Sequence, residues 1–189
     1  LYHLLTRWSE LTVLDEELSL RFKAEAKALR DSTEAYGWDG TWYWRATTDN
    51  GQRIGSAKNA EGQIFLNAQT WAVLSGLASP ERAEQAILSA RQHLYASYGA
   101  LLLAPAYSHP DPEIGYLTRY APGLRENGGV YVHAACWAVL AERKAHGVQA
   151  AYDLWRSFCP PVRGMEPEAY IAEPYVMPGN VDGPDSPFS

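Results

Sequence analysis

Apolar residues recur every three or four positions along several stretches of this chain, and this spacing predicts helices. In the first stretch the repeating positions are Leu14, Leu18, Phe22, Ala26 and Leu29. The five predicted helices cover about residues 10–35, 68–77, 80–98, 131–145 and 148–158. Asn67 and Ser79 are the expected N-caps of the second and third helices, and Gly37, Gly99 and Gly147 are expected to end the first, third and fourth.

The segments between these helices are long and rich in glycine, proline and tyrosine. Residues 40–66 are expected to be irregular or β-like, with a turn over residues 48–52, and residues 100–128 and 160–189 form two further long connections. Helices alternating with long loops indicate an all-α fold of the α/α toroid type, with the site built from loops at one end. Because five helices cannot close a ring of twelve, we expect residues 1–189 to be a fragment of a single catalytic domain.

Composition argues against some classes of binding partner but does not identify the function. The 189 residues carry a net charge of −6, which argues against nucleic acid as a partner, because binding to phosphate backbones needs a basic surface. The two cysteines, Cys136 and Cys159, suggest no disulfide framework, so a reducing, cytoplasmic location is expected. No apolar run approaches the roughly 20 residues of a membrane helix, so no membrane partner is expected.

The stretch from Tyr36 to Arg45 places five aromatic rings around one carboxylate, that of Asp39. Indole rings stack on the apolar faces of sugars, and a carboxyl group held among indoles keeps its proton to higher pH. A proton donor beside a sugar-stacking surface is what cleavage of a glycosidic bond requires. The alternative is an aromatic core patch with a turn at Asp39 and Gly40.

Other candidate residues lie near helix starts. Glu126 precedes two glycines and the fourth predicted helix, where it suits either a pair of sugar hydroxyls or the dipole of that helix. His133 lies one turn into that helix and suits either an anion site or the core. Gln69 could bind a sugar hydroxyl or be a buried amide that bonds to the backbone. Glu173 and Tyr175 could belong to a binding site or could attach the C-terminal tail to the rest of the fold. The five histidines show no metal-ligand spacing, so no metal is expected.

Taken together, these stretches resemble glycoside hydrolase family 94, the inverting β-glucoside phosphorylases. The resemblance begins near residue 10 and covers nearly the whole chain. The matching stretches are Trp38–Ala46 (WDGTWYWRA), Ile54–Ser56, Glu61–Val73 (EGQIFLNAQTWAV), Arg119–Gly129 (RYAPGLRENGG), His133–Ala134 with Trp137–Ala138, and Glu173–Val176 (EPYV).

The resemblance implies an (α/α)6 barrel, of which this chain is one part, the remainder of the barrel and an N-terminal β-sandwich domain lying outside it. It implies Asp39 as general acid, His133 as a phosphate ligand and Glu126 as a sugar contact. Trp38, Trp42, Arg45 and Gln69 are then expected to line the pocket. The implied reaction is inverting phosphorolysis of a β-linked disaccharide or oligosaccharide to an α-sugar-1-phosphate, by a homodimer with inorganic phosphate as co-substrate and no cofactor. The alternatives are an inverting hydrolase on the same barrel, which needs a second carboxylate, and a non-catalytic sugar-binding fragment.

Overall fold

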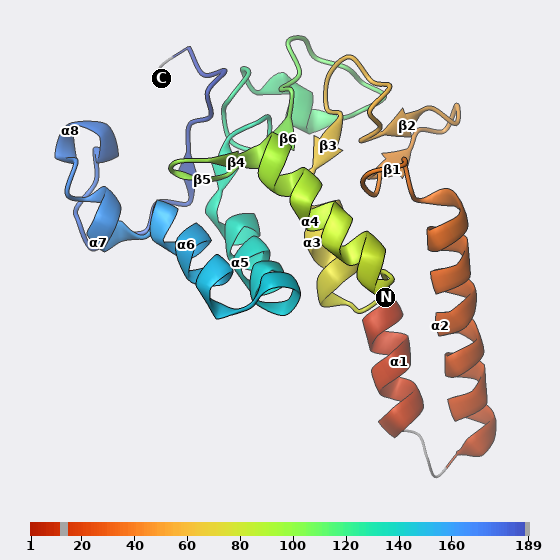
Figure 1. Ribbon diagram of the computed structural model, residues 1–189. Helices are drawn as coiled ribbons and strands as arrows, with labels where there is room; N and C mark the ends of the chain where they lie inside the picture. The colour runs from red at the N-terminus through yellow and green to blue at the C-terminus, as the bar shows by residue number, and fades with distance from the viewer. Residues whose placement is uncertain (12–14, 188–189) are drawn as a thin grey trace.

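The computed structural model describes residues 1–11 and 15–187, which are mostly helical (Figure 1). Eight α-helices lie within this part of the chain. They are α1 (Tyr2–Leu11), α2 (Glu16–Tyr36), α3 (Leu66–Leu74), α4 (Pro80–Leu94), α5 (Val132–His146), α6 (Val148–Phe158), α7 (Pro160–Arg163) and α8 (Pro167–Tyr170), with a 3-10 turn, η1, at Tyr116–Arg119. The mostly helical character of the chain is therefore as predicted.

Four antiparallel pairs of two-residue strands connect the helices. The pairs are β1 (Ala46–Thr47) with β2 (Arg53–Ile54), β3 (Ile64–Phe65) with β6 (Leu103–Ala104), β4 (Tyr95–Ala96) with β5 (Gly99–Ala100), and β7 (Val130–Tyr131) with β8 (Asn180–Val181). The β1–β2 hairpin confirms the turn predicted over residues 48–52. Strand β3 continues directly into α3, and β7 continues directly into α5.

A single residue, Leu102, joins the starts of α3 and α5. Its carbonyl oxygen accepts a hydrogen bond of 2.9 Å from Leu66 N–H, and its own N–H donates one of 2.9 Å to Gly129 O. Because both bonds are made by backbone groups, they fix the position of the start of α3 relative to the start of α5 along the helix axes. The helix starts therefore lie side by side at one end of the molecule.

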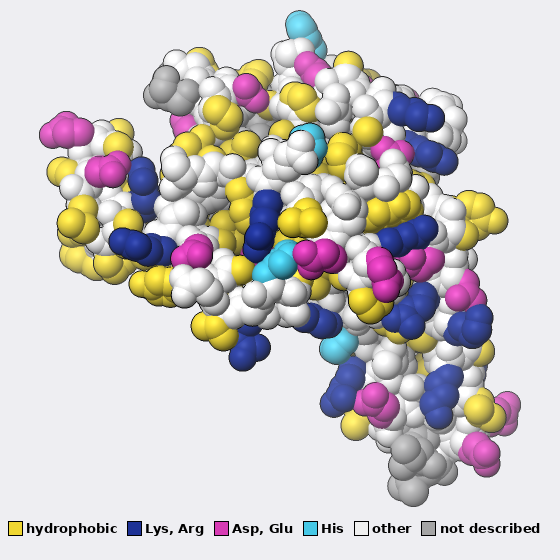
Figure 2. Space-filling view, viewed as in Figure 1, with side chains coloured by type: hydrophobic (Ala, Val, Ile, Leu, Met, Phe, Trp, Pro, Cys, Tyr) yellow, Lys and Arg dark blue, Asp and Glu magenta, His cyan; other side chains and the backbone are white. Residues whose placement is uncertain are grey.

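The helices pack around an apolar core, with α1–α2, α3–α4 and α5–α6 as antiparallel pairs and α3 parallel to α5. Helix α1 packs on α2, α3 packs on both α4 and α5, and α5 packs on α6. The largest buried cluster includes Leu66 of α3, Leu94 of α4, Ala135 of α5 and Phe158 of α6. Charged side chains of both signs cover the surface over α2 and α4, whereas the arm formed by α7 and α8 shows many apolar side chains (Figure 2).

The prediction of one long helix at the N-terminus was wrong. Two helices, α1 and α2, occupy this region, and Leu14 of the predicted apolar stripe lies outside the described residues. Asp15 caps α2, because its carboxylate accepts a hydrogen bond of 2.9 Å from Leu18 N–H. Glu16 and Glu17 then complement the N-terminal dipole of α2.

Two further boundaries differ from the prediction. Asn67 is not an N-cap, because α3 begins at Leu66 after the paired strand β3. Helix α4 begins at Pro80 with Ser79 as its cap, as predicted, but it ends at Leu94 because residues 95–100 form the β4–β5 hairpin. Among the described helices, none combines the length and the apolar character needed to cross a membrane.

Candidate functional site

A cavity of about 290 Å³ opens where α3 and α5 begin. Its lining residues come from segments far apart in the sequence: Arg45, Phe65, Asn67, Leu102, Leu117, Glu126, Tyr131, His133, Ala134 and Trp137. The cavity therefore brings together three residues that the sequence singled out separately, namely Arg45, Glu126 and His133.

Two buried oxygens in this cavity have no hydrogen-bond partner within the described chain. They are Glu126 Oε2 and Asn67 Oδ1. Arg125 Nε lies 3.7 Å from the same oxygen of Glu126, beyond a normal hydrogen bond. Unpaired buried acceptors are costly, so they indicate a place where a ligand supplies hydroxyl donors.

The backbone that carries Glu126 is held firmly by its neighbour Asn127, which is fully buried. Asn127 Oδ1 accepts a hydrogen bond of 2.8 Å from Tyr107 N–H, and its Nδ2 donates to Tyr107 O and Tyr120 O. After Asn127 the chain passes so close to Gly183 that a Cβ there would lie 2.1 Å from Gly128 O. These contacts hold the loop that directs Glu126 to the cavity.

The opposite side of the cavity suits an anion. Helix α5 begins there without a side-chain cap. Its first N–H, that of Val132, donates a hydrogen bond of 3.1 Å to Gly179 O, so the N–H groups that follow it in the first turn are the ones open to a ligand. His133 is exposed on the first turn, and its ring lies 4.4 Å from the ring of Trp137. Arg45 also lines the cavity and adds a cationic side chain. Helix dipole, imidazole and guanidinium together favour a negatively charged group.

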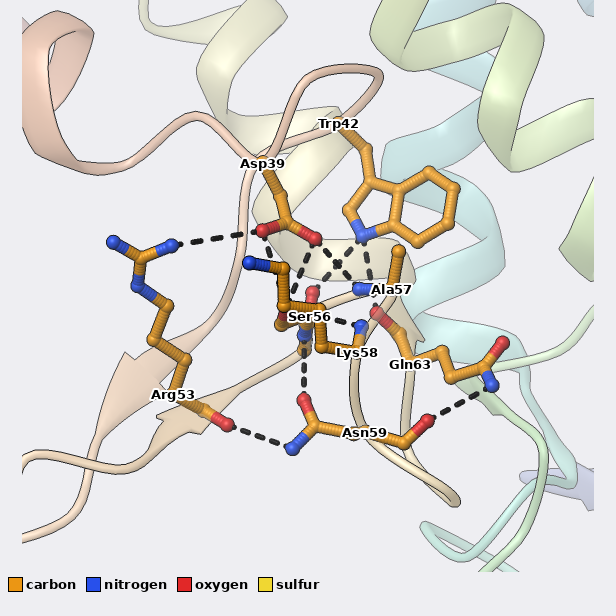
Figure 3. A network of polar contacts seen from close by, with 9 residues as sticks. Asp39, Trp42, Arg53, Ser56, Ala57, Lys58, Asn59 and Gln63 are labelled. Carbon is orange, nitrogen blue, oxygen red and sulfur yellow. Dashed lines mark hydrogen bonds and ion pairs between the residues drawn. The ribbon is translucent and has the colours of Figure 1, made fainter.

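The structure places Asp39 outside this cavity. Its side chain, 5% exposed, points into the segment of residues 53–59 (Figure 3). The Ser56 hydroxyl donates to both carboxylate oxygens at 3.0–3.1 Å, and Ala57 N–H donates at 2.6 Å. The prediction that Asp39 lies beside the cavity that holds His133 was therefore wrong.

Three other predicted lining residues are also absent from the cavity. Trp42 is buried in the main core, and its indole N–H donates to Gly55 O and Gln63 O. Trp38 packs edge-on against Tyr43, 4.9 Å between ring centroids. Gln69, fully buried, accepts from Tyr43 N–H and donates to Tyr43 O and Phe65 O. All three residues build the frame behind the cavity: the polar groups of Trp42 and Gln69 already have partners, and the Trp38 ring is packed on Tyr43.

Glu173 and Tyr175 do not line the cavity either. They lie exposed in the tail after α8, where Glu173 O accepts a hydrogen bond from Val176 N–H. The sequence reasoning missed Asn67, Tyr131 and Trp137 as cavity residues. The available signal was their position within the first two turns of α3 and at the start of α5, where side chains at one end of neighbouring helices converge.

Comparison with known proteins gives a consistent result. Residues 1–189 match the family described as the Glycosyl hydrolase 94 superfamily, catalytic domain. A solabiose phosphorylase of Paenibacillus borealis is 36% identical over an alignment of 190 positions, which covers 99% of this chain and 25% of that enzyme. An N,N'-diacetylchitobiose phosphorylase of Vibrio proteolyticus is 41% identical over 152 residues, 79% of this chain and 19% of that enzyme.

A similarity of 35% over 162 residues extends to the cyclic beta-(1,2)-glucan synthase NdvB of Rhizobium meliloti, covering 83% of this chain and 6% of that protein. The chain thus spans about a quarter or less of each of these relatives. Since the family match runs over the whole length of the chain, the chain belongs to the glycosyl hydrolase 94 superfamily and forms part of its catalytic domain.

Proposed function

We propose that the protein containing this chain, referred to below as the parent enzyme, is a phosphorylase. It cleaves a β-linked disaccharide or short oligosaccharide with inorganic phosphate and inverts the anomeric centre, which gives an α-sugar-1-phosphate. The observation that carries this proposal is the cavity at the starts of α3 and α5. It combines unpaired buried acceptors with an anion-favouring wall in a chain whose relatives include proteins named phosphorylases.

In this proposal the two walls of the cavity have different roles. His133, Arg45 and the N–H groups that follow Val132 in the first turn of α5 hold phosphate, and Glu126 and Asn67 accept hydrogen bonds from sugar hydroxyls. Phosphate attacks the anomeric carbon as an anion that is already nucleophilic. The cavity therefore needs no second carboxylate to activate a water molecule, which an inverting hydrolase requires at about 6.5–9.5 Å from the acid.

We do not assign the proton donor to Asp39. Its carboxylate points into the 53–59 segment and is fully hydrogen-bonded there. Within the described part of the chain, Glu126 is the one carboxyl group lining the cavity. Because the chain spans 25% of its solabiose phosphorylase relative, we propose that the leaving oxygen takes its proton from a part of the parent enzyme outside these 189 residues.

The proposed function also implies an architecture for the parent enzyme. The α1–α2, α3–α4 and α5–α6 hairpins suit half of an (α/α)6 barrel, with α1, α3 and α5 as inner helices. We propose that the rest of the parent enzyme completes this barrel. The homodimer and the cytoplasmic location stay predictions, and light scattering of the purified parent enzyme tests the first of them.

The test of the reaction is turnover by the parent enzyme. The enzyme is incubated with a panel of β-linked disaccharides, with and without phosphate, and the products are followed by phosphorus and proton NMR. We expect an α-sugar-1-phosphate that forms only when phosphate is present. Release of free sugars without phosphate indicates the hydrolase instead, and binding without turnover indicates a sugar-binding protein.

A histidine variant tests the anion wall. His133→Ala should raise the KM for phosphate by about 10–100-fold, because one charge-assisted contact is lost, with a smaller effect on the KM for the disaccharide. His109→Ala is the matched control, since His109 is exposed and lies outside the cavity. An unchanged KM for phosphate in His133→Ala removes His133 from the phosphate site.

A further inference from the structure

Asp39 is the centre of a network that fixes the conformation of residues 53–59 (Figure 3). Besides the bonds from Ser56 and Ala57, its Oδ1 lies 3.8 Å from Arg53 Nη1. Ser56 is itself 2% exposed, so its bonds to the carboxylate are shielded from water. The buried carboxylate thus receives hydrogen bonds from two donors, the Ser56 hydroxyl and Ala57 N–H, and the buried Ser56 hydroxyl would lose its acceptor without it.

The rest of the segment is tied to the same point. Asn59 Oδ1 accepts a hydrogen bond of 2.8 Å from Ser56 N–H, and Asn59 Nδ2 donates to Arg53 O at 2.9 Å. Trp42 Nε1 donates to Gly55 O at 2.9 Å. Trp42 therefore holds the segment from the core side while Asp39 holds it from the other.

Residues 54 and 55 of this segment contact two residues that line the cavity, Arg45 and Phe65. Ile54 O accepts a hydrogen bond of 2.7 Å from Arg45 N–H. At Gly55, where φ is +88°, an added Cβ would lie 2.7 Å from Arg45 N and 3.3 Å from Phe65 Cδ2. Arg45 and Phe65 both line the cavity, so any shift of Gly55 moves two cavity residues.

We infer that Asp39 is a positioning residue: through Ser56 and Ala57 it fixes the segment that holds Arg45 at the phosphate wall of the cavity. This role rests on the proposed function, because the ligand of Arg45 is the phosphate proposed above. It requires side-chain oxygens at position 39 that accept the hydrogen bonds of Ser56 and Ala57. It also accounts for an aspartate beside three tryptophans that does not reach the cavity.

Two substitutions, one in each partner, test the hydrogen bonds between Ser56 and Asp39. Ser56→Ala removes the hydroxyl that donates to both oxygens, and Asp39→Asn replaces one accepting oxygen and removes the charge facing Arg53. In the parent enzyme, each should raise the KM for phosphate about 10-fold and change kcat by less than about 3-fold, the size expected for a displaced binding group. The double variant should be no worse than the more impaired single variant, since both remove one tie.

Either of two results would overturn the positioning role of Asp39. A loss of kcat by several orders of magnitude in Asp39→Asn, with Ser56→Ala near wild type, makes Asp39 an acid catalyst and overturns the positioning role. Unchanged KM values in both variants overturn it as well. Ser32→Ala on the exposed face of α2 is the matched control.

Two measurements separate this inference from the proposed reaction. Calorimetric titration of the parent enzyme with inorganic phosphate should show about 10-fold weaker binding in both variants, whether or not turnover is seen. Hydrogen exchange of residues 53–59 should become faster in both variants, with residues 148–158 of α6 unchanged. Faster exchange with no phosphorolysis by the wild type keeps the tie and rejects the reaction, whereas unchanged exchange rejects the tie itself.

Discussion

At the scale of single residues, buried side-chain amides hold the backbone behind the cavity. Gln69 bonds both the N–H and the carbonyl oxygen of Tyr43, and Asn127 does the same for Tyr107. Each amide replaces a strand partner for a residue that lies in a loop. Such residues look like ligand contacts in the sequence, because amides serve both purposes equally well.

Replacing Gln69 should therefore reduce stability and leave ligand binding to the folded enzyme nearly unchanged. Gln69→Leu keeps the size of the side chain but leaves two buried backbone groups of Tyr43 unpaired, at a cost of about 2–4 kcal/mol in the free energy of unfolding. Urea unfolding measures the change. Gln92→Leu, at an exposed position of α4, should have little effect. Equal stability of the Gln69 variant and the wild type contradicts this role.

At the scale of helices, a buried ion pair joins α4 to α5. Glu142, fully buried, receives two hydrogen bonds from Arg91, at 2.8 and 2.6 Å, and one of 2.9 Å from Tyr95. His146 Nδ1 also lies 2.9 Å from Glu142 Oε2. Burial alone would raise the pKa of Glu142, but the hydrogen bonds from Arg91 and Tyr95 outweigh it and hold the pKa below its ordinary value.

This depressed pKa predicts a specific dependence of stability on pH. The ionised carboxylate stabilises the folded state above its unfolded pKa of about 4.3, and that contribution is lost as the pH falls through the lower folded-state pKa. Glu142→Gln should be less stable than wild type by about 1–3 kcal/mol at pH 7, a figure reduced because Arg91 is 37% exposed. The difference should shrink from pH 5 to pH 3 in urea unfolding, and repeating the comparison with His146→Ala removes the imidazole's contribution.

Glu25→Gln, an exposed substitution on α2, is the control for the pH series. A stability difference between Glu142→Gln and wild type that stays constant from pH 7 to pH 3 contradicts the depressed pKa.

Elements with strong local signals were predictable, and those fixed by distant partners were not. Ser79 with Pro80 placed the start of α4, and Gly147 separated α5 from α6. Asp15 was a recognisable N-cap, but the apolar spacing that continued through it led to the prediction of one long helix.

Asp39 is different, because its neighbours in sequence are indoles, whereas its hydrogen-bond donors come from residues 56 and 57. Glu126 and His133 reach one cavity because paired strands set the start of α5, a constraint that side-chain spacing does not reveal.

At the scale of the whole molecule, the helices proposed to line the barrel expose large apolar side chains. Trp8 of α1, Trp71 of α3 and Leu140 of α5 are each more than 40% exposed. On α5 this side continues the line of His133, because Cys136 and Leu140 follow at helical spacing. An apolar surface of this kind is typical of an interface, and the proposed barrel accounts for it.

Thiol labelling distinguishes a covered from an uncovered face. In the isolated chain, a maleimide should modify Cys136, which is exposed, and spare Cys159, which is buried. In the parent enzyme, labelling of Cys136 should be slower by about 10-fold or more if the barrel closes over it. Peptide mass mapping measures both sites, and unlabelled Cys159 shows that the isolated chain is folded. Equal rates at Cys136 in both proteins contradict the proposed barrel.

The way Leu102 joins α3 to α5 bears on how the specificity of the proposed phosphorylase could change. Its backbone alone makes the bonds to Leu66 and Gly129, while its side chain faces the cavity. A substitution at this position therefore leaves these backbone bonds in place, and its cost is limited to the contacts that the leucine side chain makes with the main core. Laboratory evolution toward a new sugar should find tolerated diversity here first, because the architecture depends on the peptide and not on the leucine.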